Sequence, residues 1–166
     1  MVFRTCMGFL HNKDDADDLT QDIFIQAYQS LPGFKGKAAF STWIYRIAVN
    51  ASRNMVRKST RNPILHRLDS LLGVGKDKEF SFPISDAENP ESTLIRQEHS
   101  DWVQKALDRL PDNQKTAIVL SKYDDLSQKE IAEIMNTTEG AVEALIQRAK
   151  SNLREKLSSL QKKNRE

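Results

Sequence analysis

Apolar residues recur at helical spacing in the first part of the chain. Residues 2–11 are apolar enough for a short helix, and a second helix is expected from about Asp15 to Ser30, where Pro32 and Gly33 end it. The spacing of its apolar residues predicts one inward face, made of Ala16, Leu19, Ile23 and Ala27.

A third helix is predicted after the Pro-Gly turn, with Ser41 as its expected N-cap. Its apolar residues again follow the i, i+3, i+4, i+7 pattern of a buried stripe. The stripe consists of Ile44, Ile47, Ala48, Ala51 and Met55.

Helical periodicity returns after residue 91. One helix is expected before Pro111 and another from Gln114 to Tyr123. The apolar positions of these two helices are Leu94, Trp102, Val103, Ala106, Leu107, Leu110, Ala117, Ile118 and Leu120.

The next segment has the pattern of a helix-turn-helix. Ser127 and Glu130 form a capping box, and Leu126 with Ile131 is placed for a hydrophobic staple. The first helix should end near Met135 and be followed by a turn over residues 136–138. A longer helix should begin close to Glu139, and Ala132 is the small residue at which the two helices are expected to meet. Such helix pairs also occur in folds unrelated to DNA. The predicted buried stripe of the longer helix is Val142, Leu145, Ile146, Ala149 and Leu153.

Between the two helical regions the pattern dissolves into Pro, Gly, Ser and charged residues, with a short helical turn expected over residues 64–72. We therefore predict an all-α protein of two small helical domains joined by a flexible linker. The domains are expected over residues 1–60 and 93–166, the second containing the helix-turn-helix, and the linker over residues 61–92.

Charge is segregated along the chain. Lys and Arg number 25 against 23 Asp and Glu, so the net charge is only +2, yet no acid stands between Gly33 and Leu68. An acid-free basic stretch is typical of a surface that binds a polyanion, which points to nucleic acid. Its basic residues are Lys35, Lys37, Arg46, Arg53, Arg57, Lys58, Arg61 and Arg67.

The polar side of the third helix has the chemistry of a DNA-binding face. Arg46, Asn50, Arg53 and Arg57 stack on one side of the helix, with Asn54 beside them. Arg neutralises phosphates, Asn bonds base edges, and aromatic rings stack on unpaired bases. The alternative is a solvated basic face with aromatics in the core. The aromatic candidates are Phe34, Phe40, Trp43 and Tyr45.

The second helix carries an acidic strip outside its buried face. Asp18, Gln21, Asp22 and Ile25 lie at i, i+3, i+4 and i+7. This strip is either a solvated face or a docking strip for a basic partner helix.

Several function classes have little support. The single cysteine, Cys6, is expected in the core and excludes a disulfide framework, and the three histidines lack metal-ligand spacing. No catalytic constellation, metal site or cofactor motif is present, so we expect neither an enzyme nor a cofactor. No apolar run is long enough for a membrane span, and no secretion leader is present, so a cytoplasmic protein is expected.

Two segments together resemble a known family. DADDLTQDIFIQAYQSLPGFKGKAAFSTWIYRIAVNASRN is similar to conserved region two, and LPDNQKTAIVLSKYDDLSQKEIAEIMNTTEGAVEALIQRAKSNLREKL to region four, of the extracytoplasmic-function (ECF) sigma factors of bacterial RNA polymerase, in the sigma-70 family. The segments cover more than half of the chain, in the family's order. The resemblance implies a sigma factor that binds core RNA polymerase through its clamp and flap, recognises and melts promoter DNA, and is held by an anti-sigma factor.

The resemblance also implies a role for particular residues. Core polymerase would bind Asp18, Gln21, Asp22 and Ile25. The minus-ten element would meet Phe34, Lys35, Lys37, Trp43, Arg46, Asn50, Arg53, Asn54 and Arg57. The minus-thirty-five element would meet Glu139, Glu143, Ala144, Gln147, Arg148, Lys150, Ser151 and Arg154.

The chain departs from the family pattern at two places. Relatives usually carry about one and a half more helices before the position of Met1, which leaves a misassigned start or a truncation as alternatives. In the last helix, Glu143, Ala144 and Leu145 stand where many relatives have a basic, a small and a basic residue. The rival hypothesis is a stand-alone helix-turn-helix regulator that binds DNA without polymerase, but such a regulator has no need for the acidic strip.

Overall fold

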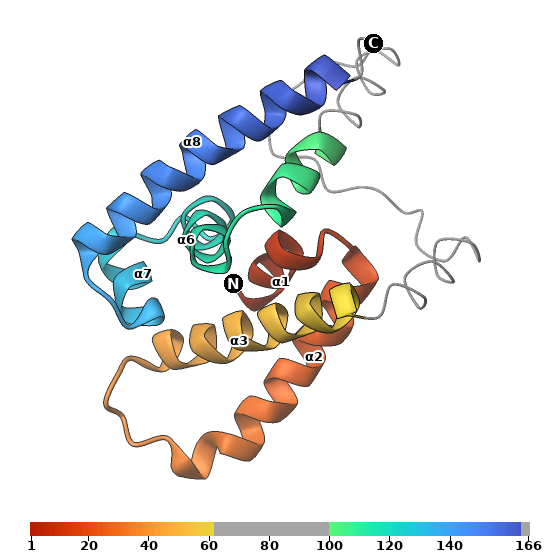
Figure 1. Ribbon diagram of the computed structural model, residues 1–166. Helices are drawn as coiled ribbons and strands as arrows, with labels where there is room; N and C mark the ends of the chain where they lie inside the picture. Colours follow the sequence, from red (N-terminus) through yellow and green to blue (C-terminus); the bar gives the residue numbers. More distant parts are fainter. Residues whose placement is uncertain (62–99, 164–166) are drawn as a thin grey trace, which may run out of the picture.

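The computed structural model describes residues 1–61 and 100–163 (Figure 1). Helix α1 spans Val2–Leu10 and α2 spans Lys13–Ser30. The second helix begins two residues earlier than the sequence predicts, because the side chain of Asn12 accepts a hydrogen bond from the Asp15 amide and so caps the helix.

A short 3-10 helix, η1, over Leu31–Gly33 ends α2 where Pro32 was expected to end it, and α3 follows over Phe40–Arg61. The prediction that Ser41 caps α3 is wrong. The Trp43 amide already bonds to the Ala39 carbonyl, so Ser41 lies inside the first turn and its side chain is exposed.

The first three helices enclose a core of their own. All four predicted inward residues of α2 are buried, as are Ile44 and Ala48 of α3, whereas Ile47, Ala51 and Met55 are half-buried at its edge. Cys6 of α1 is fully buried here as a free thiol, as predicted. The helical periodicity therefore identified this core correctly.

The second half is also helical. A helix over residues 100–108 is followed by α6 (Asp112–Tyr123), α7 (Gln128–Met135) and α8 (Glu139–Lys163). The predicted capping box is present in both directions, and Asn136 ends α7 in the left-handed conformation with φ of 53°. The helix-turn-helix is confirmed, as is the all-α fold, since the described residues contain no strand. The predicted linker and the helical turn over residues 64–72 lie outside the described residues, apart from Arg61.

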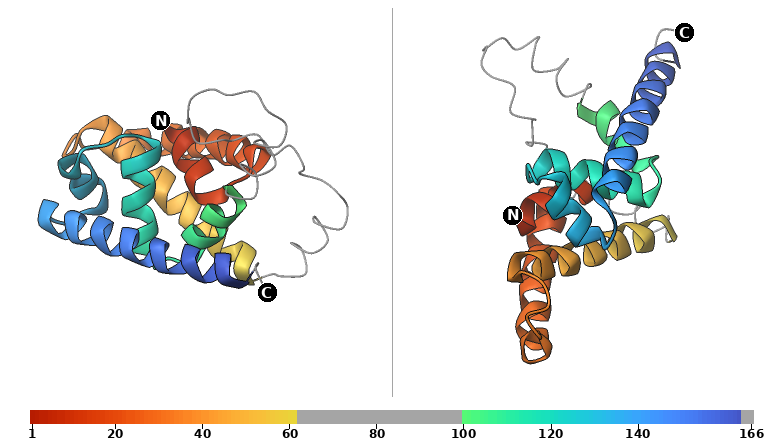
Figure 2. Two further views of the ribbon diagram at one scale, coloured as in Figure 1. Left: turned by 90° about the horizontal axis from the view of Figure 1, so that it is seen from above. Right: turned by 90° about the vertical axis from the view of Figure 1, so that its left-hand side faces the viewer.

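The two halves pack against each other, which the sequence did not predict. Helix α1 lies against α6, and α3 against α7 (Figures 1 and 2). A second core cluster crosses the boundary, because Phe9, Tyr45 and Val49 of the first half are buried among residues of α6, α7 and α8. The far end of α2 projects away from the second half (Figure 2), whereas residues 36–39 of the loop before α3 line a cleft with Lys129, Glu133 and Asn136 of the second half.

Candidate nucleic-acid interface

The basic face of α3 is less exposed than its spacing suggests. Asn50, Asn54 and Arg57 are exposed, but Arg46 and Arg53 are half-buried because the second half covers them. The Nη2 atom of Arg46 donates a 2.6 Å hydrogen bond to the backbone carbonyl of Glu133 at the end of α7. The helix therefore presents Asn50, Asn54 and Arg57 to solvent, whereas Arg46 and Arg53 lie against the second half.

The other two arginines share one carboxylate. The Nη2 atoms of Arg57 and Arg53 lie 2.6 Å and 3.2 Å from Oδ2 of Asp112, the first residue of α6. The hydrogen bond from Arg57, joined by that from Arg53, outweighs partial burial and holds the pKa of Asp112 below its usual range. Asp112 is therefore ionised at neutral pH.

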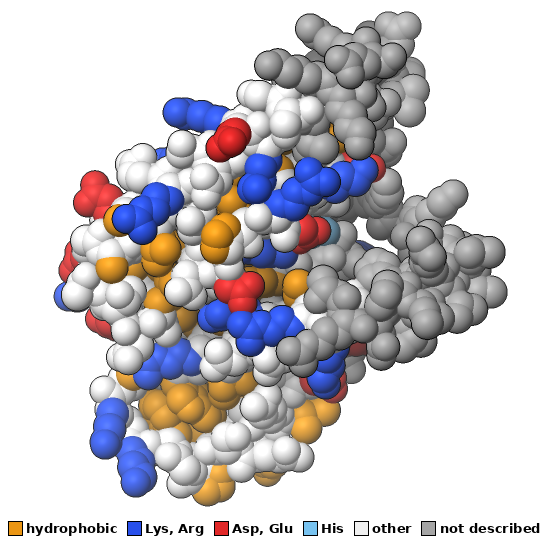
Figure 3. Space-filling model, viewed as in Figure 1, with side chains coloured by type: hydrophobic (Ala, Val, Ile, Leu, Met, Phe, Trp, Pro, Cys, Tyr) orange, Lys and Arg blue, Asp and Glu red, His pale blue; other side chains and the backbone are white. Residues whose placement is uncertain are grey.

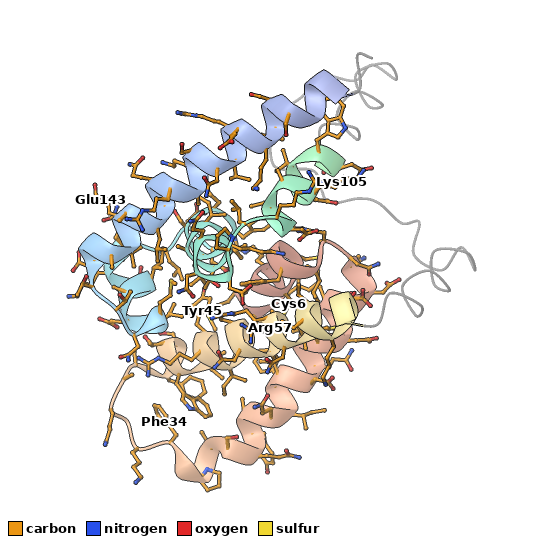
Figure 4. All side chains as sticks on the ribbon, viewed as in Figure 1. Cys6, Phe34, Tyr45, Arg57, Lys105 and Glu143 are labelled. Carbon is orange, nitrogen blue, oxygen red and sulfur yellow. The ribbon has the colours of Figure 1, made fainter. Side chains whose placement is uncertain are left out.

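Three aromatic side chains gather where α2 and α3 diverge. The ring centroid of Phe34 lies 5.7 Å from that of Phe40 and 5.0 Å from that of Trp43, and Phe40 lies 5.5 Å from Trp43. Figure 4 shows Phe34 in the fork between the helices, and Figure 3 shows apolar side chains gathered there beside basic ones. Lys35 and Lys37 of the same loop are exposed. The cluster offers rings and cations together, as single-stranded nucleic acid requires.

Tyr45 does not belong to this cluster, contrary to the sequence hypothesis. Its side chain is 5% exposed and lies in the core between the halves. Burial, and secondarily the negative charge of Asp124, raise the pKa of Tyr45 to about 12. A ring in this position cannot stack on a base.

The strip on α2 is fully available. Asp18, Gln21, Asp22 and Ile25 are all exposed, the last at 57%. Sequence reasoning missed that the strip continues as an apolar surface toward η1. Three further large side chains are exposed there: Phe24, Tyr28 and Leu31. The sequence did contain a signal for them, because none of the three belongs to the apolar stripe that was predicted to face the core.

The outward face of α8 is also open. Glu139, Glu143, Gln147, Arg148, Lys150, Ser151 and Arg154 are exposed, and Ala144 is half-buried. Arg148, Lys150 and Arg154 supply cations for phosphates and Gln147 an amide for bases, while the two carboxylates lie toward the start of the helix, where Glu143 could accept a hydrogen bond from cytosine. The structure thus presents three separate surfaces, on α2, on α3 with its loop, and on α8.

Leu145 corrects one prediction. It is half-buried rather than buried, and it lines a cleft between α8 and the α3 residues Arg46, Asn50 and Arg53. Because α3 lies nearby, an apolar residue at this position packs toward the first half. A basic residue there would face two arginines.

We expect Leu145→Arg to lower the free energy of unfolding by about 1 kcal/mol, because packing is lost and like charges meet in the cleft. Thermal unfolding measures the change. The matched control is Gln147→Arg, which adds the same charge at an exposed position of α8. An unchanged melting temperature together with tighter binding to duplex DNA would contradict the assignment of Leu145.

Buried polar groups join the halves at sites that the sequence did not reveal. Lys115 of α6, with a side chain 6% exposed, places Nζ 2.6 Å from Asp108 Oδ1 and 3.0 Å from the Phe9 carbonyl of α1. Burial raises the pKa of Asp108, but hydrogen bonds from His11 and Lys115 outweigh it and leave that pKa below its usual range. These contacts tie α6 to α1.

A second buried group, Asp124, follows α6 and has a side chain only 1% exposed. It accepts a 2.6 Å hydrogen bond from Thr5 Oγ1 of α1, and the Arg4 guanidinium lies 3.8 Å away. Each buried charge therefore has partners across the boundary, which its burial requires.

Neither a metal site nor a membrane span is found among the described residues. No three of their His, Cys, Asp and Glu side chains lie together as ligands would. None of the helices in residues 1–61 and 100–163 is both long and apolar enough to cross a bilayer.

Comparison with protein families and curated relatives gives a consistent result. Residues 1–62 match the family model "Sigma-70 region 2", and residues 100–153 match "Sigma-70, region 4". The RNA polymerase sigma-H factor of Pseudomonas aeruginosa is 35% identical over 156 residues, which are 92% of this chain and 78% of that protein. The ECF RNA polymerase sigma factor SigW of Bacillus subtilis is 34% identical over 159 residues, covering 96% of this chain and 84% of SigW.

Solved structures support the same fold. CnrH, solved in complex with the cytosolic domain of CnrY, matches with a TM-score of 0.62 at 23% identity, over 95% of this chain and 80% of that one. The sigma factor RpoE of Bartonella quintana, solved with the anti-sigma factor NepR, matches with a TM-score of 0.59 at 22% identity, over 95% and 89%. The chain belongs to the sigma-70 family, as an ECF sigma factor that directs promoter recognition by RNA polymerase.

Proposed function

We propose that the three surfaces divide the work of a sigma factor. The α2 strip docks on the clamp of core RNA polymerase, the α3 face with its loop binds the minus-ten element, and α8 binds the minus-thirty-five element. The observation that carries this proposal is the separation of an acidic surface on α2 from the surfaces of α3 and α8 that carry arginine and lysine side chains. The corresponding division of the chain is residues 1–60, the linker 61–92, and residues 93–166.

The α2 strip has the composition of a protein interface. Asp18 and Asp22 supply charge for a basic partner helix, and exposed Ile25, Phe24 and Tyr28 supply apolar area beside them. Aromatic side chains surrounded by polar ones are typical of binding hot spots. A stand-alone regulator would leave this surface without a purpose.

The α3 surface combines the groups needed to hold a melted strand. Phe34, Phe40 and Trp43 offer ring faces to an unpaired base, while Lys35 and Lys37 stand beside them for phosphates. Extruding a base has a cost that such a pocket offsets by stacking. The chain contributes recognition and melting, and the chemistry of RNA synthesis belongs to the polymerase.

We expect Arg57→Ala and Arg53→Ala to weaken transcription to a similar degree on all minus-ten sequences, whereas Asn50→Ala changes base preference. Phosphate contacts position a protein and base contacts specify sequence. Run-off transcription with core polymerase on a library of minus-ten variants measures both effects. If Asn50→Ala lowered the signal equally across the library, its base-reading role would be withdrawn.

The same test examines the function as a whole. Run-off transcription by core polymerase should depend on this protein, and the protein should co-purify with core polymerase. We place it in the cytoplasm with the polymerase.

We also propose an anti-sigma factor as a partner, because the similar sigma factor of Bartonella quintana was solved in complex with one. DNA binding without any effect on core polymerase would favour the stand-alone regulator.

A further inference from the structure

One acid on the outward face of α8 has no structural role that its position explains. Glu143 is exposed and lies on the side of α8 that is turned away from α6 (Figure 4). The residues three and four positions before and after it are Gly140, Glu139, Ile146 and Gln147. None of them is a cation, so Glu143 cannot form the ion pair along the helix that often stabilises an exposed acid.

The dipole of the helix does not explain this acid either. Thr138 caps α8, because its side chain accepts a 3.2 Å hydrogen bond from the Ala141 amide. Helix α8 begins at Glu139, so Glu143 lies beyond the first turn, which is the part of a helix where the dipole stabilises a carboxylate. On a face that binds phosphates, a carboxylate weakens binding unless a hydrogen-bond donor of the DNA meets it.

We propose that Glu143 selects a cytosine within the minus-thirty-five element. The inference rests on the proposed function of α8 and names a sequence feature that this helix reads. A carboxylate only accepts hydrogen bonds, and the N4 amino group of cytosine is a donor in the major groove. Guanine and thymine present acceptors there, and adenine presents an acceptor beside its donor. The carboxylate therefore repels guanine and thymine and prefers cytosine to adenine.

Gln147 supplies a second contact on the same flank of α8. It is exposed and follows Glu143 by four residues, which is a separation of roughly 6 Å along the helix axis. Successive bases of one strand are about 3.4 Å apart, so the two side chains reach different base pairs. A glutamine amide matches the N6 and N7 atoms of adenine. The pair thus predicts cytosine at one position and adenine one or two base pairs away.

The rest of the outward face allows the helix to approach base edges. Small residues, Gly140, Ala144 and Ser151, occupy its centre, and a Cβ atom added at Gly140 would meet nothing within 4 Å. Lys150 and Arg154 are exposed and continue the flank of the two base-reading side chains, where they can bind phosphates. The major groove of DNA is wide enough for such a helix.

The test is a selection of promoter DNA by reconstituted holoenzyme. Core polymerase and the full-length protein are mixed with duplex templates that are randomised across the minus-ten and minus-thirty-five elements. Each template carries a transcribed barcode, so sequencing of the run-off transcripts identifies the active promoters. The parent protein should select cytosine over guanine or thymine by about fivefold or more at one minus-thirty-five position.

Three variants assign that preference to its side chain. Glu143→Gln should change the preferred base at this position from cytosine to adenine and leave the other positions unchanged. Gln147→Ala should relax only the neighbouring adenine preference. The matched control is Glu155→Gln, which removes the same charge at an exposed position of α8 outside the three proposed surfaces and should keep the parent's preferences.

The outcomes separate the inference from the proposed function. A parent without the cytosine preference, or a Glu143→Gln variant that changes transcription by one factor on every template, would overturn the inference, since the carboxylate would then act only through its charge. An equal base change with Glu155→Gln would overturn it as well. The proposed function fails separately, if no transcription depends on the parent protein. Selection of randomised duplex DNA by the full-length chain alone then tests Glu143 with the same variants.

Discussion

Replacing Asp18 and Asp22 together by Arg is expected to abolish binding to core RNA polymerase while leaving the fold intact. Both side chains are exposed on α2, so the reversal should not disturb the core that Ile23 and Leu19 form on the other side of the helix. Losing one partner of a desolvated charge pair costs roughly 2 to 5 kcal/mol at an interface, which is a loss of more than tenfold in affinity. A pull-down with core polymerase measures the effect, and circular dichroism checks the fold.

The chain offers a control with the same charge change away from α2. Glu155 is an exposed acid of α8 that belongs to none of the three proposed surfaces. The single variant Glu155→Arg should therefore keep polymerase binding, whereas Asp22→Arg should weaken it. Normal retention of polymerase by the Asp18→Arg, Asp22→Arg double variant would remove the docking assignment, and an equal loss with Glu155→Arg would mean that the double variant acts only through its overall charge.

Local patterns predicted most of the fold because they depend on residues a few positions apart. The capping box of Ser127 and Glu130 and the buried stripe of α2 both follow from spacing within one helix, and both are present. The start of α3 was misplaced because Ser41 is a favourable cap residue in a position where the Ala39 carbonyl already begins the helix. Propensity alone does not decide between neighbouring start points.

What the sequence did not reveal depends on contacts between distant residues. Tyr45 and Leu145 were assigned from single helices, yet their exposure is set by the packing of one half on the other. The pairing of Arg53 with Asp112 spans 59 residues and follows no local spacing. The exposure of the candidate residues on α2, and of all but Ala144 on α8, could be predicted from the spacing within one helix, whereas the α3 face could not be described fully without the second half.

The second large effect is expected at the ion pair between Lys115 of α6, which also donates to the Phe9 carbonyl of α1, and Asp108 of the preceding helix. Asp108→Ala would leave the Lys115 ammonium, 6% exposed, with only the Phe9 carbonyl and the face of the Phe9 ring, 5.6 Å from Nζ. A charge left in this environment should cost about 2 to 3 kcal/mol of unfolding free energy. The cost falls below the 3 to 5 kcal/mol of a fully buried pair because water already reaches Asp108, which is 50% exposed. Urea unfolding measures it from the midpoint at constant m-value.

Lys115→Met should cost less than Asp108→Ala, about 1 kcal/mol or slightly more, because Met fills the same space without a charge and only the Phe9 carbonyl loses a partner. Combining the two substitutions should then recover stability relative to Asp108→Ala alone, since no ammonium remains to be stranded. A coupling energy of at least about 1 kcal/mol is expected from this double-mutant cycle, well above the roughly 0.5 kcal/mol within which independent sites add. Additive effects would mean that Lys115 reaches water when Asp108 is removed, and that Asp108 is not what stabilises the ammonium beside Phe9.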